Sequence, residues 1–250
     1  MNVPLLDNTR TLVLTGASRG IGHATVKKFG ASGWRIITIS RQPFSALCPW
    51  PGGEKNHVQL DLGDPVELGR GIEEIRHRLG GDGLHALVNN AAVSPKGPNG
   101  KRLGAMDTPF DLWRQVFNVN FFAPVALARG LVEELSKAQG CVVNVTSIAG
   151  SRVHPFAGSA YATSKAALAS LTREMAHDFG PRGIRVNAIA PGEIDTSILS
   201  PGTEKIVEEQ IPMRRLGTPD EVADVIHFLC EKGASYVSGA EIQINGGQHV

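Results

Sequence analysis

The sequence predicts an α/β fold: a doubly wound, seven-stranded parallel sheet with helices on both faces. From residue 11 onward, short runs rich in β-branched residues alternate with longer helical patterns, which is typical of parallel strands joined by crossover helices. No linker composition, internal repeat or low-complexity tract divides the chain. Residues 1–250 are therefore expected to form a single domain.

Seven runs of mainly aliphatic or β-branched residues supply the expected strands. Each run is short and is followed by turn-forming or polar residues, as buried parallel strands are. The runs occupy residues 11–15, 35–40, 58–60, 84–89, 141–146, 185–190 and 241–244.

Helical patterns fill most of the intervals between these strands. They lie near residues 20–32, 64–79, 108–138, 159–179 and 219–231. Gly33, Gly80 and Gly180 follow three of them, which suits left-handed C-caps.

Two segments break the alternation, and a third could act as a lid. Residues 42–55 carry three prolines and two glycines where a crossover helix is usual, so a loop or one short turn is expected. Residues 94–107 are rich in glycine and proline and follow a strand end, where they form either a pocket wall or a surface insertion. Residues 201–216 follow the turn at Pro191 and Gly192 and could close as a lid; their basic residues Lys205, Arg214 and Arg215 would meet either an acidic substrate or solvent.

Charge and cysteine content exclude several classes of protein. Lys and Arg total 25 against 24 Asp and Glu, so no net field would draw the chain to nucleic acid or anionic lipid. Cys48, Cys141 and Cys230 are odd in number and lack CxxC spacing, which argues against a disulfide framework and a cysteine-built metal site. With no signal peptide pattern and no run of about 18 apolar residues, we expect a soluble cytoplasmic protein.

A glycine-rich turn follows the first strand and opens the first helix. It has the form GxxxGxG, built on Gly16, Gly20 and Gly22, and Ser18 adds a hydroxyl. Absent side chains let backbone N–H groups and the helix N-terminus approach a phosphate. This context indicates a dinucleotide site, although a tight turn without a ligand has the same glycines.

The end of the second strand bears on the choice between NAD(H) and NADP(H). It carries Ser40 and Arg41 rather than a carboxylate, and Arg19 lies in the glycine turn. Two guanidinium groups could bind a 2′-phosphate, which favours NADP(H), or they could simply be solvated. Asp61, followed by Leu62, could accept from an adenine amine or cap the next helix.

Tyr161 and Lys165 are four residues apart and share one face of an expected helix. Lowering a tyrosine pKa from about 10 to about 7 takes roughly 4 kcal/mol. One ammonium group about 4 Å away at an effective dielectric of about 20 supplies energy of that order. Ser147, at the preceding strand end, could hold a substrate carbonyl for proton transfer from Tyr161.

These features, taken in order along nearly the whole chain, resemble the classical short-chain dehydrogenase/reductase family. The matching segments are 15–22, 61–62, 89–92, 191–192 and 245–247, together with Asn120, Ser147, Tyr161, Lys165 and Thr196. The resemblance implies a Rossmann fold and a homotetramer. The closing segment departs from the family by having Asn245 in the place of an aspartate.

The resemblance also implies a role for each catalytic residue. Tyr161 would be the general acid/base, Ser147 would polarise the substrate oxygen, and Asn120 would hold a water in a proton relay. Lys165 would bind the nicotinamide ribose and lower the Tyr161 pKa. Asn90 would contact the adenosine ribose or support the central strands.

The cofactor set follows from the motifs and the resemblance together. Ile194 and Thr196 would anchor the carboxamide. The full set is Gly16, Ser18, Arg19, Gly20, Ile21, Gly22, Ser40, Arg41, Asp61, Leu62, Asn90, Ala91, Tyr161, Lys165, Pro191, Gly192, Ile194 and Thr196.

Substrate selectivity is expected from side chains beyond the strand ends. His154 and Glu193 suggest a polar substrate with hydroxyl or amine groups. The alternative is that His154 is a structural histidine and that Glu193 caps a loop. The candidates are Ser94, Pro95, Ser147, His154, Phe156, Glu193 and Ile198.

The function that these expectations favour is NADPH-linked reduction of a ketone or aldehyde to an alcohol. NAD-dependent oxidation of a polar alcohol and a non-catalytic nucleotide-binding role remain as alternatives. A hydrolase is not favoured, because the GxSxG pattern of this sequence, at residues 16–20, lies within the glycine turn already interpreted as a dinucleotide site. An epimerase or dehydratase would be expected to carry a larger C-terminal substrate domain.

Overall fold

The seven expected strands form one parallel sheet, in the order β3-β2-β1-β4-β5-β6-β7. The computed structural model describes residues 9–44, 52–196, 199–200 and 202–250. The order reverses between β1 and β4, which creates the switch point where α/β sheets bind ligands. The strands are β1 (Thr11–Thr15), β2 (Arg35–Ser40), β3 (His57–Gln59), β4 (Ala86–Asn89), β5 (Cys141–Val145), β6 (Arg185–Pro191) and β7 (Glu241–Ile244).

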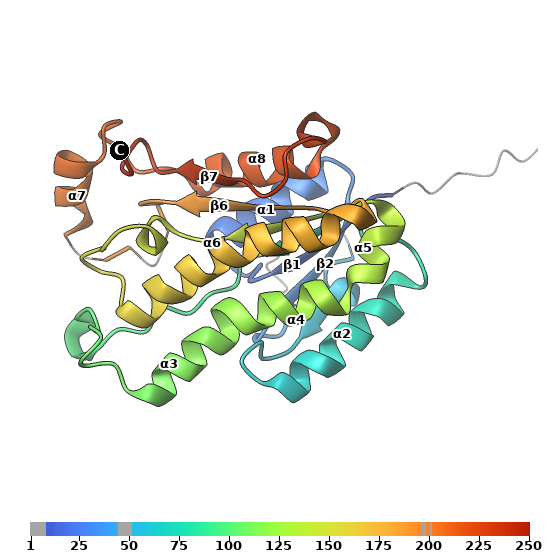
Figure 1. Ribbon diagram of the computed structural model, residues 1–250, viewed down its shortest axis with the longest axis horizontal. Coiled ribbons are helices and arrows are strands. Elements are labelled where there is room, and N and C mark those ends of the chain that lie inside the picture. Colours follow the sequence, from blue (N-terminus) through green and yellow to red (C-terminus); the bar gives the residue numbers. More distant parts are fainter. Residues whose placement is uncertain (1–8, 45–51, 197–198, 201) are drawn as a thin grey trace, which may run out of the picture.

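Helices cover both faces of the sheet, as a doubly wound fold requires (Figure 1). Among the described residues, no helix is long and apolar enough to cross a membrane. The helices are α1 (Gly20–Ala31), α2 (Pro65–Leu79), α3 (Phe110–Phe117), α4 (Ala123–Gly130), α5 (Val132–Ala138), α6 (Ser159–Phe179), α7 (Thr203–Gln210) and α8 (Pro219–Cys230).

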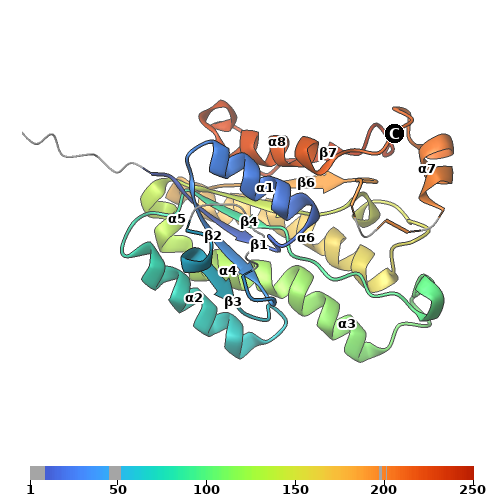
Figure 2. The ribbon, with the colours of Figure 1, turned by 180° about the vertical axis from the view of Figure 1, so that it is seen from behind.

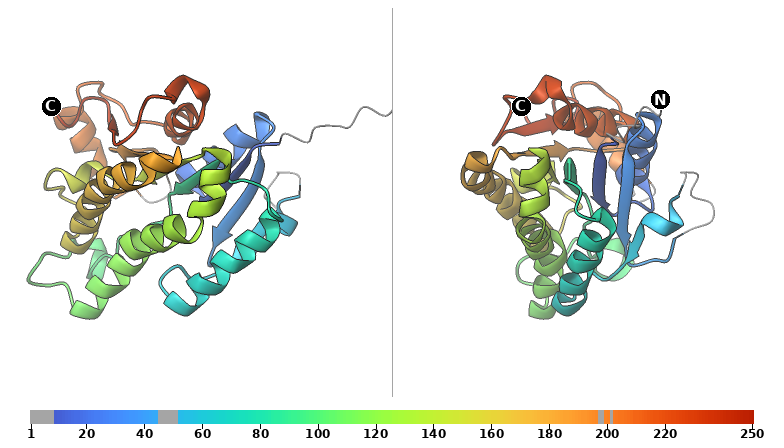
Figure 3. Two further views of the ribbon diagram at one scale, coloured as in Figure 1. Left: turned by 45° about the vertical axis from the view of Figure 1, so that its right-hand side comes forward. Right: turned by 90° about the vertical axis from the view of Figure 1, so that its right-hand side faces the viewer.

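Alternate side chains of the strands pack into two separate hydrophobic cores, one on each face of the sheet. Val13 of β1 packs with apolar residues of α2, α4, α5 and α6, whereas its neighbours Leu12 and Leu14 pack with α1 and α8 on the other face (Figure 2). Successive strand side chains point to opposite faces, so a continuous apolar run serves both layers. The view turned by 90° shows the sheet between the two helical layers (Figure 3, right).

The long helix expected over residues 108–138 is divided in the structure. It consists of α3, a π-helical turn at Asn118–Phe122, then α4 and α5. Pro124, near the start of α4, has no N–H and cannot donate to the carbonyl four residues earlier. The prediction of one continuous helix was therefore wrong.

Other boundaries also differ from the prediction. Gly80 is a left-handed C-cap with φ 62°, but Gly180 has φ −51° and opens a 3₁₀ turn at Gly180–Arg182. The left-handed residue there is Gly183, with φ 75°. The segment 42–55 ends in a 3₁₀ turn at Glu54–Asn56, and its residues 45–51 lie outside the described part.

Candidate active site

The carboxyl ends of β1, β4, β5 and β6 meet at one edge of the sheet, on the left in Figure 1. The predicted catalytic and cofactor residues follow these strand ends. Parallel strands place all their carboxyl ends together, so motifs far apart in the sequence converge there.

The glycine turn is too crowded for larger residues. Gly16 has φ 73°, and a Cβ added to it would lie 2.9 Å from the Ala91 Cα. A Cβ on Gly22 would lie 2.1 Å from the Gly16 carbonyl oxygen. The helix therefore starts in direct contact with the turn, and only glycine permits this approach.

The N-terminus of α1 is open to an anion. Its N-cap, Arg19, makes no side-chain capping bond, and the first turn carries no acidic residue. By contrast, the Asp64 side chain caps α2 by accepting from Val66 and Glu67 N–H groups. Uncapped N–H groups with the positive end of the helix dipole suit a phosphate.

Asn90 supports the central strands, which is one of its two predicted roles. Its side-chain amide donates to the carbonyl oxygens of Thr15 and Gly16, both at 3.0 Å. The backbone N–H groups of Asn90 and Ala91 donate to the Thr15 hydroxyl, also at 3.0 Å. Asn90 thus binds the end of β4 to the glycine turn.

At the end of β2, Ser40 donates to the Gln42 carbonyl at 2.8 Å. Arg19 and Arg41 are exposed, and within the described part of the chain neither guanidinium makes an ion pair or hydrogen bond. Both groups are therefore available to an added anion. Asp61 accepts the Gly63 N–H at 2.8 Å and does not cap α2.

Tyr161 faces Ser147 across the space between β5 and α6. Burial raises the pKa of Tyr161, a hydrogen bond with the Ser147 side chain lowers it, and the Glu193 carboxylate raises it again. The net direction is upward. Tyr161 is therefore a protonated phenol at neutral pH, held beside the Ser147 hydroxyl.

Lys165 lies one helical turn beyond Tyr161 and is 1% exposed. Its ammonium group donates to the Val145 carbonyl at 2.6 Å and lies 5.8 Å from the centre of the Tyr161 ring. Burial lowers the pKa of Lys165 to about 7. Burial is the largest cause of the pKa shift of Tyr161, and the expectation that Lys165 lowers that pKa stays a prediction.

Asn120 lies in the π-helical turn and is fully buried. Its side-chain amide donates to the Val93 carbonyl and the Ser164 hydroxyl, both at 3.0 Å, and accepts the Val93 N–H at 2.8 Å. The side chain thus holds the loop after β4. The Asn120 carbonyl lacks the α-helical donor that Pro124 would otherwise supply.

The turn after β6 completes the edge of the sheet. A Cβ on Gly192 would lie 2.6 Å from the Asn245 Cβ, so the closing segment packs directly on this turn. Ile194 is 6% exposed in the core beside α8. A Cβ on Gly20 would lie 3.3 Å from the Thr196 methyl group, which places Thr196 over the glycine turn.

Comparison with known proteins identifies the family. A family model described as "Enoyl-(Acyl carrier protein) reductase" matches residues 16–249. The Bradyrhizobium diazoefficiens protein FixR is 64% identical over 242 residues, which cover 96% of this chain and 87% of FixR. A Brucella ovis oxidoreductase of the short-chain dehydrogenase/reductase family, solved with a partially ordered NAD, is 61% identical with a TM-score of 0.83.

The alignment with that structure covers 95% of this chain and 100% of the Brucella ovis chain. The 3-oxoacyl-[acyl-carrier-protein] reductase FabG of Aquifex aeolicus is 32% identical over 249 residues, 94% of this chain and 95% of FabG. This chain is a short-chain dehydrogenase/reductase. The resemblance found in the sequence is confirmed, and with it the oxidoreductase class.

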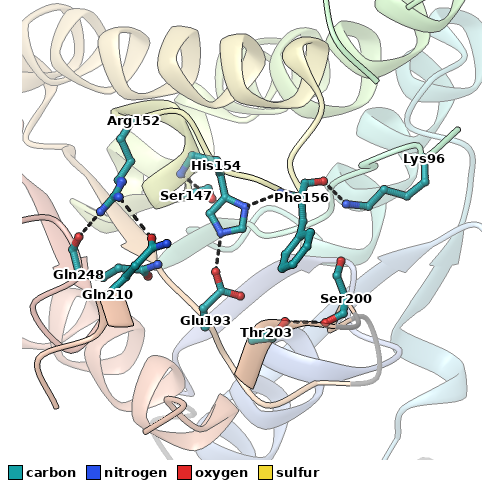
Figure 4. A network of polar contacts seen from close by, with 11 residues as sticks. Lys96, Ser147, Arg152, His154, Phe156, Glu193, Ser200, Thr203, Gln210 and Gln248 are labelled. Atoms are coloured by element: carbon teal, nitrogen blue, oxygen red, sulfur yellow. Dashed lines mark hydrogen bonds and ion pairs between the residues drawn. The ribbon is translucent and has the colours of Figure 1, made fainter. Parts of the chain in front are cut away.

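In this dehydrogenase/reductase, His154, Phe156 and Glu193, three of the predicted substrate residues, are linked by hydrogen bonds (Figure 4). His154 donates from Nε2 to Glu193 Oε1 at 2.5 Å and accepts the Phe156 N–H at its Nδ1 at 3.2 Å. Both ring nitrogens are occupied by protein groups, so His154 positions Glu193 instead of offering a nitrogen to substrate. Ser94 is exposed, and Ile198 lies outside the described residues.

Part of the segment 94–107 lines a cavity of about 10 Å³, and its role as a wall of the substrate pocket stays a prediction. Pro95 and Leu103 line a small pocket together with Gly158 and Tyr161. The segment is fastened across the pocket by Arg102, whose Nε donates to the Ala157 carbonyl at 2.8 Å.

Sequence reasoning missed Lys96, whose ammonium group donates to the Phe156 carbonyl. It also missed Ser164, the hydroxyl partner of the Asn120 side chain. Lys96 is adjacent to Pro95 in the expected pocket wall, so its position could have been noticed. Nothing in the sequence links Ser164 to Asn120, which is 44 residues away.

Proposed function

We propose that this protein is an NADPH-linked reductase that converts a ketone or aldehyde to an alcohol. The observation that carries the proposal is the meeting of Tyr161, Ser147 and the buried Lys165 beside the open N-terminus of α1. One region then offers a proton donor, an oxygen-binding hydroxyl and a phosphate-binding helix.

The residues of the glycine turn fit a dinucleotide. Gly16 and Gly22 allow the backbone to close against Ala91, and α1 presents N–H groups without a capping side chain. Ser18, Ile21 and Thr196 flank this position. The cofactor, when bound, supplies the hydride in reduction or accepts it in oxidation.

Arg19 and Arg41 support the choice of NADP(H). Both guanidinium groups are exposed, and the end of β2 has no carboxylate that would accept from the ribose hydroxyls. The remaining proposed contacts to the cofactor are Ser40, Asp61, Leu62, Lys165, Pro191, Gly192 and Ile194.

The protein's own groups carry the proton chemistry. Ser147 and Tyr161 hold the substrate oxygen between their hydroxyls, and Tyr161 donates its proton as charge develops there. The raised pKa of Tyr161 keeps the phenol protonated at neutral pH, which is the form that donates a proton in reduction. The carbonyl of Asn120 and the Lys165 ammonium are the proposed route by which the proton is replaced.

A second function, NAD-linked oxidation of an alcohol, is favoured by the Brucella ovis relative, whose structure was solved with NAD. Following the family resemblance, we also propose a cytoplasmic homotetramer. Its partner in either direction is a small carbonyl compound or alcohol.

The experiment replaces Tyr161 with Phe and measures NADPH oxidation on the ketone that the unaltered protein reduces fastest in a panel. We expect kcat to fall about 10³-fold, because the phenol proton is lost, while NADPH binding measured by fluorescence stays unchanged. Tyr236→Phe, at the one other tyrosine, which is fully exposed, is the control. Retained turnover in Tyr161→Phe would remove the proposed mechanism.

A further inference from the structure

The backbone that carries Arg41 is held by the edge strand of the sheet. β3 lies at this edge, beside β2 (Figure 2). Three successive carbonyl oxygens after β2 begins to end accept hydrogen bonds from three successive positions at or next to β3. The bonds run from the Leu60 N–H to Ser40 at 3.0 Å, from the Gln59 side-chain amide to Arg41 at 3.1 Å, and from His57 Nε2 to Gln42 at 2.9 Å.

The His57 ring is itself fixed by β2. The Gln42 carbonyl can only accept, so Nε2 carries the proton of the neutral imidazole, and Nδ1 accepts the Thr38 hydroxyl at 2.8 Å. Thr38 is 1% exposed, so the ring is anchored to a buried side chain. The Ser40 hydroxyl donates to the same Gln42 carbonyl at 2.8 Å, which is therefore held by two donors.

These bonds restrict the backbone on both sides of Arg41. The Ser40 carbonyl belongs to the planar peptide group before Arg41, and the Arg41 carbonyl belongs to the group after it. Holding both groups restricts both backbone torsion angles of Arg41, and these angles set the direction in which its side chain leaves the chain. The guanidinium group itself is exposed and makes no hydrogen bond or ion pair within the described part of the chain.

We propose that His57 and Gln59 are positioning residues for cofactor selection. They hold the backbone of residues 41 and 42 so that the Arg41 guanidinium group meets the 2′-phosphate of NADP(H). Binding an anion costs an arginine part of its conformational freedom, and a backbone ordered beforehand reduces that cost. This role rests on the proposed function, in which Arg41 binds the 2′-phosphate.

The positioning role differs from a purely structural one in what it does to the two cofactors. NAD(H) lacks the 2′-phosphate, so a change that acts through Arg41 weakens only NADP(H). A change that merely loosens the edge of the sheet would weaken both cofactors together, because they share the adenosine and pyrophosphate groups.

Two substitutions test the role. Gln59→Met removes the donor to the Arg41 carbonyl at similar size and at an exposed position, and His57→Phe keeps a ring without its nitrogens. We expect each to weaken NADPH binding at least about threefold and the double variant at least about tenfold, with NADH binding changed less than about twofold. Fluorescence titration at fixed salt measures both affinities.

Two further variants show whether the effect passes through the proposed bonds. His57→Gln places a side-chain amide donor near the position of Nε2 and should bind NADPH within about twofold of the unaltered protein. In an Arg41→Ala background, Gln59→Met and His57→Phe together should change NADPH binding less than about twofold, because the group that they position is missing.

The controls are Gln115→Met and His77→Phe, at exposed positions of α3 and α2. Both should leave the affinities for NADPH and NADH unchanged.

The outcomes separate this role from the proposed function. If Arg41→Ala weakens NADPH binding but Gln59→Met and His57→Phe do not, the positioning role is overturned and the NADP(H) preference stands. Equal weakening of NADPH and NADH in the two variants would also overturn the role. Unchanged NADPH binding in Arg41→Ala would overturn the binding of the 2′-phosphate by Arg41, and with it the role of His57 and Gln59.

Discussion

At the scale of single residues, burial sets the electrostatics of this active site. Tyr161 and Lys165 are both titratable, and burial is the largest cause of the pKa shift in each. It raises the pKa of the phenol and lowers that of the ammonium group, so both neutral forms are favoured. In its neutral form the Tyr161 phenol can donate a proton.

The cofactor preference also belongs to single residues. We expect Arg41→Ala to weaken NADPH binding at least about tenfold and NADH binding by less than about threefold, because only NADPH carries the 2′-phosphate. Fluorescence titration at fixed salt measures both affinities. Arg70→Ala, at an exposed arginine of α2, is the control.

Equal weakening of both cofactors in Arg41→Ala would mean that the 2′-phosphate binds elsewhere. Tighter binding of NADH than of NADPH by the unaltered protein would favour the NAD-linked alcohol dehydrogenase instead.

At the scale of elements, two irregular segments shape the site. The π-helical turn at Asn118–Phe122 places Asn120 so that its side chain holds the loop after β4. Pro124 cannot complete an α-helical bond there. Such single-turn irregularities inside helices frequently mark functional positions.

The glycine turn gives a prediction at this scale. Gly22→Ala puts a Cβ 2.1 Å from the Gly16 carbonyl oxygen, so α1 must move away from the turn. We expect a loss of about 1–3 kcal/mol in the free energy of unfolding and at least tenfold weaker NADPH binding. Urea unfolding and fluorescence titration measure the two effects.

Gly69→Ala is the matched control, because a Cβ there meets nothing within 4 Å on α2. It should stabilise the protein by about 0.5–1 kcal/mol through helix propensity. If Gly22→Ala behaves like Gly69→Ala, the close approach of α1 to the turn is not needed for binding.

At the scale of the whole molecule, the apolar cores on the two faces of the sheet leave an ionisable side chain, that of Lys165, almost completely buried. Lys165 is among the largest fully buried side chains of the described residues. Its pKa is lowered in the folded state to about 7 from 10.5. Between these pH values the unfolded chain binds more protons, so stability contributed through Lys165 rises with pH.

The substitution Lys165→Met tests how much the burial of the Lys165 ammonium group destabilises the folded protein. We expect the variant to be inactive but more stable at pH 7, since it avoids a burial penalty of roughly 4 kcal/mol and loses one hydrogen bond worth about 1 kcal/mol. Its advantage should shrink by about 2 kcal/mol at pH 9, where Lys165 is neutral in the folded protein. Urea unfolding at both pH values measures it.

The exposed Lys101→Met is the control, and its stability relative to the unaltered protein should not change between the two pH values. An advantage of Lys165→Met that is the same at pH 7 and pH 9 would show that burial does not shift the Lys165 pKa.

Much of the fold could be predicted because it depends on local patterns. Strand periodicity located all seven strands of the sheet, and the shift of β3 to His57–Gln59 is only one residue. The division of the helix at Asn118–Phe122 was missed, since helical periodicity continues through it. The left-handed glycine after α6 was misplaced because a 3₁₀ turn extends that helix.

By itself, the sequence determined the alternation of strands and helices, the glycine turn, and the one-face spacing of Tyr161 and Lys165. These properties depend on residues within a few positions of one another. Only the tertiary structure decided that both ring nitrogens of His154 bond to Phe156 and Glu193, and that the Lys96 ammonium group donates to the Phe156 carbonyl. Burial and charge pairing depend on which strand ends meet in space, and no local spacing specifies that.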